Sequence, residues 1–423
     1  MSKFFLFLVA LFIGLALTAC GERRSTAYDP VPLVVHGEVV AVDATAARQD
    51  EIVMFNLQIE IENHALGRYE PAEGSFLGMY IERDAATGSI RSFEADMGVN
   101  HAIFVYTMAL GDDYPIRWVL ENIAGVKAPF IVLMPPDEGD VFDTDLLADF
   151  ARETGRFNVP MFVHLYPVVE GHRFVPTEYI AFFREAREVF ARYAPNVALV
   201  WGFDAQSMMF STQFYPGRDA VDWVHLIIYN DVDTSGEFKD LFTYVDFFYF
   251  AFQQEAPLVV STAVSHYALE SNRYFTHEAA ARIEYIYGRL QEYPRIRAIL
   301  YRSYNDLPGR GQKFAVNSAR DISEAYARAV GTSHFLSRLA GNADLPETAT
   351  IRIHSPFRAI MRNSYFYIPV RGLMYDARFA YIEELMGREV EIGGELFFTI
   401  ADVNRVSGAD FFVDMQQGLL VLR

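Results

Sequence analysis

The sequence predicts an α/β protein: a closed (β/α)8 barrel followed by a small α+β module. Short apolar runs recur along the central part of the chain, and each is followed by a stretch long enough for a helix. Strands that are apolar along their whole length are typical of a parallel sheet covered on both faces. Eight such units in succession favour a closed barrel over an open doubly wound sheet. The eight runs are Leu77–Ile81, His101–Tyr106, Pro129–Met134, Pro160–Leu165, Val197–Phe203, Asp222–Tyr229, Pro257–Val264 and Arg297–Tyr301.

The start of the chain has the pattern of an export signal. A short basic start precedes an apolar run, Phe4–Leu17, which is too short for a typical membrane-spanning helix but suits a signal peptide. Residues 17–21 read Leu-Thr-Ala-Cys-Gly and resemble a bacterial lipobox; the alternative is a plain secretory signal. The resemblance implies a signal peptide over 1–19, a lipid on Cys20 and a polar tether over 20–32. We therefore expect an extracytoplasmic protein that is lipid-anchored to the cell membrane.

Composition excludes several classes of function. Cys20 is the only cysteine, which excludes structural disulfides, a cysteine-based metal site and a catalytic thiol. The formal net charge is −19 and the sequence has no basic stripe, so we expect no nucleic-acid partner. Aromatic residues make up 15% of the chain, and those in loops would suit the faces of sugar rings.

The segments on either side of the barrel, which we place at 71–340, differ from it in pattern. In the N-terminal extension, 33–70, polar and apolar residues alternate over Val53–Ile61, which predicts a strand with one buried face but does not identify its partner. Beyond a linker, 347–423 contains short strand-like runs and one small helix pattern, Ala380–Met386, and we expect a separate α+β module there.

Amphipathic segments between the apolar runs predict the helices of the barrel. No glycine-rich phosphate loop follows the first run, which argues against a dinucleotide-binding sheet. The clearest predicted helices are Asp145–Thr154, Glu178–Tyr193, Thr276–Glu292 and Asp321–Leu339.

Candidate functional residues follow the ends of the predicted strands, because a barrel of this kind carries its active site at the carboxyl ends of the strands. The rim formed by these loops combines acids, amides and aromatic residues, as carbohydrate clefts often do, although loop tips are polar in most proteins. Its members include Asp113, Glu170, Asp204, Asp231, His266, Tyr267 and Tyr304.

Several motifs of the barrel resemble the family twenty-six glycoside hydrolases. The opening residues Leu77-Gly78-Met79-Tyr80 and the loop Gly111–Pro115 match the start of that family. The strongest match is Phe214–Val224, which reads Phe-Tyr-Pro-Gly-Arg-Asp-Ala-Val-Asp-Trp-Val and leads to Tyr229-Asn230. The resemblance covers Phe76 to Val330 and implies a β-mannanase-like barrel.

The resemblance also implies where catalytic residues should lie. The family hydrolyses β-1,4-mannans and, in some members, other β-glycans with retention, which needs two carboxyl groups about 5–5.5 Å apart. Aligned from Pro160, the acid/base of the family falls on Val168 and its arginine on His164. Its nucleophile, five residues after Pro257, falls on Thr262.

These two residues do not support the family's chemistry. A valine donates no proton and a threonine forms no glycosyl ester, and losing a general acid alone costs roughly 10²–10⁴-fold in rate. The resemblance therefore implies a cleft for a polysaccharide rather than the activity itself. The candidate substrate-binding residues are Trp201, Tyr229, His164, Tyr267 and Asp113, with a core or rim position as the alternative for the aromatic ones.

Other carboxylates provide an alternative site. Glu170 and Asp204 are the fallback catalytic residues, and Asp231 is a third acid at the rim; a pair about 6.5–9.5 Å apart would suit an inverting enzyme. The spacing of His164, His172 and His266 matches no compact zinc motif, so we expect no metal and no other cofactor.

The C-terminal module has a resemblance of its own. Ser364–Arg371 and Leu385–Val390 resemble the copper amine oxidase N-terminal-like stalk domains of exported proteins, and Leu396 to Asp414 reads as a second half-copy. Such modules imply attachment or spacing at the cell envelope. The sequence shows no ligand cluster for copper.

Three hypotheses follow for the whole chain. The leading one is a lipoprotein whose noncatalytic, glycosidase-like barrel binds a polysaccharide or cell-wall glycan, or scaffolds an envelope assembly. The second is an active glycoside hydrolase on β-mannan or a related β-glycan that uses relocated carboxylates. The third is an interaction protein with an envelope protein partner and a filled cleft, and it predicts no exposed aromatic platform at Trp201, Tyr229 or Tyr267.

Overall fold

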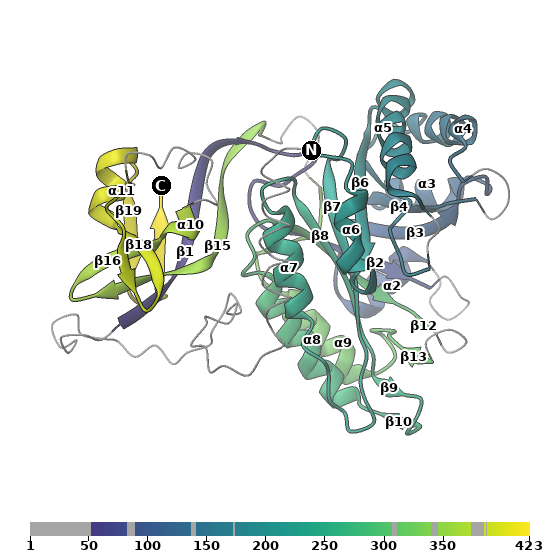
Figure 1. The fold of residues 1–423 in the computed structure, drawn as a ribbon. Helices are drawn as coiled ribbons and strands as arrows, with labels where there is room; N and C mark the ends of the chain where they lie inside the picture. Colours follow the sequence, from purple (N-terminus) through teal and green to yellow (C-terminus); the bar gives the residue numbers. More distant parts are fainter. Residues whose placement is uncertain are drawn as a thin grey trace. The chain divides into compact units, whose positions relative to one another are not determined.

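The computed structural model describes residues 52–82, 89–136, 141–171, 174–306, 311–339, 346–373, 385 and 387–423. The signal, Cys20, the tether, His172 and most of the predicted helix Ala380–Met386 lie outside these residues. Two large sheets organise the described chain (Figure 1). None of the helices in this part of the chain combines the length and apolar character that crossing a bilayer requires.

The first sheet is a closed barrel of eight parallel strands. Its strands pair in sequence order, and the last strand pairs back with the first, which confirms the predicted (β/α)8 fold. A short ninth strand, β14 (Phe335–Leu336), adds to the edge of the first. The barrel strands are β2 (Ser75–Ile81), β3 (Ile103–Ala109), β4 (Ala128–Met134), β5 (Met161–Leu165), β6 (Val197–Asp204), β7 (Trp223–Asn230), β8 (Leu258–Val264) and β11 (Ile296–Ser303).

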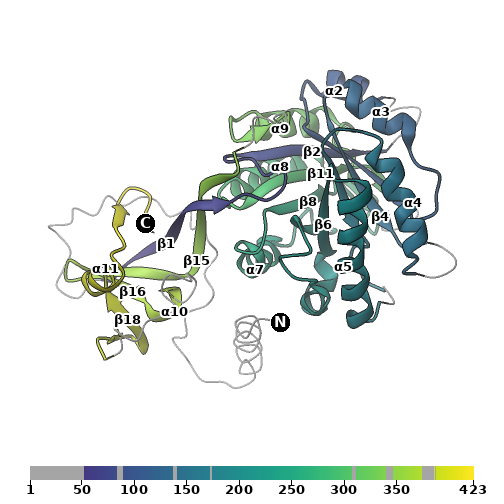
Figure 2. The ribbon, with the colours of Figure 1, turned by 90° about the horizontal axis from the view of Figure 1, so that it is seen from above.

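Helices follow the strands and surround the barrel (Figure 2). Local sequence fixes several of their ends: Asp143 caps α4 by accepting hydrogen bonds from two backbone amides, and Pro176 opens α5. The predicted helix Asp321–Leu339 ends earlier, at Val330, because Gly331 follows and the chain then pairs as β14. The helices are α2 (Ile90–Met97), α3 (Ile116–Ala124), α4 (Thr144–Gly155), α5 (Pro176–Tyr193), α6 (Met208–Ser211), α7 (Phe242–Phe252), α8 (Thr276–Leu290) and α9 (Arg320–Val330).

Smaller elements lie in the loops at the carboxyl ends of the strands. Two 3-10 turns, η1 (Ala205–Ser207) and η2 (Thr212–Phe214), flank α6 after strand β6. Two short strand pairs follow β8 and β11 and form the rim on that side of the barrel. These pairs are β9 (Tyr267–Ala268) with β10 (Arg273–Tyr274), and β12 (Asn305–Asp306) with β13 (Gln312–Lys313).

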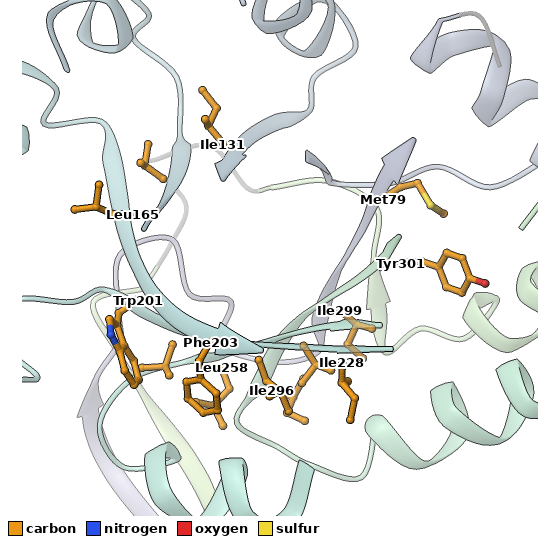
Figure 3. Packing of buried hydrophobic residues seen from close by; sticks show 14 of the residues in the cluster. Met79, Ile131, Leu165, Trp201, Phe203, Ile228, Leu258, Ile296, Ile299 and Tyr301 are labelled. Carbon is orange, nitrogen blue, oxygen red and sulfur yellow. The ribbon is translucent and has the colours of Figure 1, made fainter. Parts of the chain in front are cut away.

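Side chains of each barrel strand alternate between two hydrophobic cores. The inner core fills the barrel and includes Phe130, Phe162 and Trp223, whose rings contact one another in sequence with centroids 5.8 Å and 5.5 Å apart. The outer core lies between the strands and the helices, and Leu258 and Tyr301 belong to it (Figure 3). Because neighbouring residues of a strand face opposite sides, the two cores show which side chains point into the barrel.

The second sheet combines both ends of the described chain. Strand β1 (Ile52–Ala65) pairs antiparallel with β15 (Thr348–Arg362) and parallel with β20 (Leu419–Leu422), so these two strands are the partners of the alternating run. Phe55, Leu57 and Ile59 of β1 are buried in the core of this sheet. The strand order is β17 (Val390–Ile392), β18 (Glu395–Thr399), β16 (Tyr365–Pro369), β15, β1, β20 and β19 (Phe411–Asp414), with α10 (Val370–Leu373) and α11 (Ile400–Ser407) beside them.

Candidate functional site

The carboxyl ends of three neighbouring barrel strands bring an arginine and two tyrosines together. Arg302 of β11 stands opposite Tyr80 of β2 in the strand register. On the other side of β11 lies β8. Thr262 of β8 stands opposite Tyr301 of β11, so the next residues, Ala263 and Arg302, are also neighbours. Ala263 in turn stands opposite Tyr229 of β7. Ala263 thus lies between Tyr229 and Arg302 in the strand register. The register places all these residues near the carboxyl ends of their strands, where barrel enzymes bind their substrates.

Tyr304 completes a cluster that we call the tyrosine–arginine cluster: Tyr80, Tyr229, Arg302 and Tyr304. The Cζ atom of Arg302 lies 5.0 Å from the ring centroid of Tyr80 and 6.0 Å from those of Tyr229 and Tyr304. The Tyr304 hydroxyl donates to the Tyr229 hydroxyl over 3.3 Å. Phe314, fully buried, packs behind both of these rings. Since a guanidinium over aromatic faces is stabilised by cation–π attraction, the rings fix where the positive charge lies.

The electrostatics of the cluster are set by Arg302. Burial raises the pKa of the Tyr80 hydroxyl above its usual value, although the guanidinium of Arg302 acts against this rise. An arginine remains protonated at any physiological pH. Arg302 is therefore the formally charged side chain of the cluster, and the tyrosines supply rings and hydroxyl groups.

A histidine pair lies below the cluster, inside the barrel. The Nδ1 atoms of His164 and His225 are 3.0 Å apart, and Nε2 of His225 lies 2.7 Å from the hydroxyl of Ser261. Burial, with a smaller effect of the Arg302 charge, lowers the pKa of His164 to about 3. Burial also lowers the pKa of His225 far below its usual value, with smaller effects of His164 and Arg302. Both rings are thus neutral, and one Nδ1 donates while the other accepts. Because His164 is fully buried, it orders the barrel interior and does not reach a ligand at the rim.

Neither position predicted for a catalytic residue faces the barrel mouth. Val168 packs in the outer core, and its amide donates to the carbonyl of Gly202 over 2.9 Å. Thr262 is also fully buried and lies between Ser261 and Ala263, so it points toward the helices. The alignment by residue counting is therefore corrected: even a glutamate at these two positions would not point at a substrate in the mouth.

The fallback carboxylates lie on adjacent loops. The Asp204 carboxylate caps turn η1 by accepting from the amide of Ser207 over 2.7 Å, and its second oxygen accepts from the amide of Glu170 over 3.3 Å. The Glu170 side chain is exposed. The structure therefore brings the two loops together, while backbone amides hold the Asp204 carboxylate in place.

The other residues predicted to bind substrate divide by exposure. Trp201 is fully buried in the outer core, with its ring centroid 5.0 Å from Tyr215 and 5.5 Å from Phe203, so its assignment to a cleft is corrected (Figure 3). Tyr267 is 8% exposed, and its hydroxyl donates to the Asn272 side chain. Asp113 is exposed in the loop after β3, and Tyr229 is partly exposed within the tyrosine–arginine cluster. Of the three aromatic residues, only Tyr229 offers an accessible ring.

Sequence reasoning missed the central residue of the cluster. The sequence patterns placed Tyr304 at the rim and Tyr80 within a family-like motif, but Arg302 was not among the candidate residues. The signal was present in the alternation of β11: Ala298 and Leu300 belong to the inner core, so Arg302, two residues further on, points inward at the mouth. A charged residue at an inward position of a barrel strand is a candidate for ligand binding.

No other feature of the described ranges competes with this cluster as a site for chemistry. A cavity of about 420 Å³ lies at the amino-terminal end of the barrel and is lined by Arg68, Tyr69, Gly155 and Asn196, among others. The opposite end is the functional face of such barrels. Within those ranges, no group of three or more histidine, aspartate, glutamate or cysteine side chains is arranged to hold a metal ion.

Comparison with known proteins finds similar folds but no named family. No protein-family model matches the chain, and no protein with curated annotation matches it. An engineered protein is 13% identical over 68% of this chain and 77% of its own, with a TM-score of 0.48. A GH26 β-mannanase from Bacteroides ovatus is 11% identical over 64% of this chain and 92% of its own, with a TM-score of 0.45. A mannanase from Bacillus subtilis is 14% identical over 66% of this chain and 91% of its own, with a TM-score of 0.40. The barrel assignment itself rests on the strand order and closure of this chain.

Proposed function

We propose that this protein is a glycan-binding lipoprotein of the cell envelope whose glycosidase-like barrel holds a polysaccharide without hydrolysing it by the retaining mechanism. The tyrosine–arginine cluster at the carboxyl end of the barrel carries the proposal. It joins aromatic rings, hydroxyl groups and a guanidinium at one place on the functional face. The motif resemblance to family twenty-six hydrolases supports the same class of ligand.

The chemistry of the cluster suits a sugar. A sugar ring has an apolar face of C–H groups, which packs on an aromatic ring, and hydroxyl groups at its edge, which need hydrogen-bond partners. Tyrosine supplies both a ring and a hydroxyl that donates and accepts. Binding sites for small ligands commonly combine apolar and aromatic walls with a few placed polar groups.

The positions of the carboxylates argue against retaining hydrolysis. That mechanism needs two carboxyl groups about 5–5.5 Å apart, which flank the bond that breaks. On strand β8 the side chains that point inward near the mouth are those of Ser261 and Ala263, and neither is a carboxylate. The carboxylate of Asp204 is engaged by two backbone amides.

A second candidate function is hydrolysis with Glu170 and Asp204 as relocated carboxylates. The hydrogen bond from the Glu170 amide to Asp204 favours it, because the two loops adjoin at the mouth. This candidate predicts new reducing ends that disappear in Glu170→Gln.

Binding and cleavage are tested together with the full chain in detergent on insoluble mannan, xylan, β-glucan and peptidoglycan. We expect retention on at least one glycan without new reducing ends. Replacing Tyr229 or Tyr304 with alanine should weaken binding about two- to tenfold, since an aromatic contact contributes roughly 0.5–1.5 kcal/mol. The control is Tyr365→Ala, because Tyr365 is 66% exposed on β16 of the other sheet.

Each outcome decides between the hypotheses. Retention that Tyr229→Ala weakens and Tyr365→Ala does not would support the proposal. Reducing ends that Glu170→Gln abolishes would replace it with the hydrolase. No retention on any glycan would overturn both and favour an envelope protein as the partner.

A further inference from the structure

Strand β11 carries or adjoins three arginines, and only one of them lacks an acidic partner. Arg295, just before the strand, donates to the Glu70 carboxylate, and Nε of Arg297 lies 3.4 Å from the same carboxylate. These residues lie at the amino-terminal end of the barrel. Arg302 lies near the other end, and no carboxylate of the described chain forms an ion pair with it within 4.0 Å. A guanidinium removed from water without a partner is costly, so a function is expected to maintain it.

The guanidinium of Arg302 is arranged to meet a ligand. Its Nε is buried and has no hydrogen-bond partner in the described ranges. The side chain as a whole is partly exposed, so its terminal nitrogens remain accessible from the mouth. The ring centroids of Tyr80, Tyr229 and Tyr304 lie 5.0, 6.0 and 6.0 Å from its Cζ atom. The protein thus holds the side chain in place and leaves its donors for another group.

The described titratable groups around Arg302 form no ion pair with it. Glu82, which follows β2, is exposed, and its carboxylate accepts from the amide of Asn305 over 3.3 Å. His164 and His225, below, are neutral, because burial disfavours their charged forms. A local positive charge therefore remains in a protein whose formal net charge is −19.

We propose that the mouth of the barrel selects an acidic glycan, and that Arg302 binds the carboxylate of a uronic acid residue. This inference rests on the proposed glycan-binding function and names its ligand class. The planar fork of donors in a guanidinium matches the two oxygens of a carboxylate, while the tyrosine rings pack on the sugar ring that bears it. In the strand register, Ala263 lies between Tyr229 and Arg302, so no larger side chain of β8 separates the ring from the guanidinium.

The negative net charge of the protein separates a specific contact at Arg302 from general electrostatic attraction. A strongly acidic protein repels an anionic polysaccharide at long range, so general attraction does not explain retention of such a ligand. At about 0.15 M salt, charges more than roughly 8 Å apart are largely screened from each other. The long-range repulsion is therefore weak, whereas a direct contact between a carboxylate and Arg302 is screened much less. Binding of an acidic glycan at that ionic strength would therefore require a local site.

The test compares ligands that differ only in charge. The full chain in detergent is titrated calorimetrically with tetrasaccharides of mannuronic, galacturonic and glucuronic acid, each alongside its methyl ester. We expect at least one acid to bind 10- to 100-fold more tightly than its ester, as hydrogen bonds to a charged group imply. The Arg302→Gln variant should bind acid and ester equally, and Arg302→Lys should keep part of the preference.

Controls separate this inference from the function on which it rests. Arg152→Gln is the matched control, since Arg152 also lies over a tyrosine ring, 4.6 Å from the centroid of Tyr193, but on the helical surface. Esters or neutral glycans that bind as well as every acid would overturn the acidic ligand and keep glycan binding. Binding of neither form would overturn both. A sulfated tetrasaccharide that binds as tightly as the acids would overturn the carboxylate as the selected group. The comparison of acid with ester needs no variant. It therefore shows whether the protein prefers the charged sugar even if Arg302→Gln fails to fold.

Discussion

The arginines at the two ends of strand β11 differ in whether they have an acidic partner. At the amino-terminal end, Arg295 and Arg297 share the buried carboxylate of Glu70, and backbone carbonyls accept from Nε of Arg295 and Nη2 of Arg297. At the carboxyl end, Arg302 lies close to three tyrosine rings and forms no ion pair with an acid of the described chain. Strand β11 and the residue before it therefore combine two arginines that share an acidic partner with one that has no such partner among the described residues.

This difference in pairing separates arginines that stabilise the fold from an arginine that is available to bind a ligand. A buried charge whose partners all come from the chain contributes to folding, and removing one partner leaves the other uncompensated. A charge without such a partner contributes little to folding, and its removal is expected to affect binding. The predictions below test this distinction from the largest expected effect to the smallest.

The largest effect is expected at Glu70. Replacing it with glutamine removes the charge that compensates Arg295 and Arg297, and we expect a loss of about 3–5 kcal/mol in the free energy of unfolding. Chemical denaturation measures it, with the exposed neighbour Glu73→Gln as the control. A loss below about 1 kcal/mol would contradict the idea that the amino-terminal network stabilises the barrel.

The histidines inside the barrel predict a loss of stability in acid. The folded-state pKa of His164 is about 3, below the usual 6.5, because the ring is buried. The unfolded chain therefore binds more protons as the pH falls below 6.5, and stability present above that pH is lost toward pH 3. Between pH 6.5 and 5 we expect this one group to cost about 1–2 kcal/mol.

Unfolding free energies at pH 7, 6 and 5 measure this slope. The His164→Gln variant should show a shallower decline, whereas His277→Gln, at an exposed position, should leave the decline unchanged. Stability that rises as the pH falls from 7 to 5 would show that the histidine pair is not held neutral.

A moderate gain is expected at Thr262. Its hydroxyl is buried and has no hydrogen-bond partner among the described residues, so Thr262→Val should stabilise the protein by about 1 kcal/mol and leave glycan binding unchanged. The measurement is the thermal midpoint, compared with Thr243→Val at an exposed position of α7. Weakened glycan binding in Thr262→Val would mean that Thr262 belongs to the mouth after all.

The smallest effect on stability is expected at Arg302. Arg302→Gln breaks no ion pair and no hydrogen bond of the described chain, so its free energy of unfolding should change by less than about 1 kcal/mol. The same denaturation experiment as for Glu70 measures it. A loss as large as that of Glu70→Gln would place Arg302 among the structural arginines.

The sequence alone predicts the barrel in some detail. All eight apolar runs became barrel strands, because a strand that is covered on both faces must be apolar along its length. The helices Asp145–Thr154 and Glu178–Tyr193 were placed within two residues of the observed bounds, since their periodicity and first-turn residues are local signals. Local patterns thus determine elements and their order.

Tertiary structure decided which side chains share a site. Counting along the sequence placed Val168 and Thr262 at the mouth, but the alternation of side chains turns Thr262 toward the helices, and Val168 packs in the same outer layer. Register between strands far apart in sequence then brought Tyr80 beside Arg302. A shift of one residue reverses the direction of every side chain in a strand, so residue identity alone does not fix the site.

The second sheet shows the same division. The alternation over Val53–Ile61 identified a strand with one buried face, and that much is encoded within a few residues. Its pairing with β15 joins residues about three hundred positions apart, for example Ile59 with Ile353. The sequence by itself determined the strands and helices, because burial pattern and capping are local. Only the folded chain decided their partners and the contents of the barrel mouth, because pairing and register depend on contacts between distant segments.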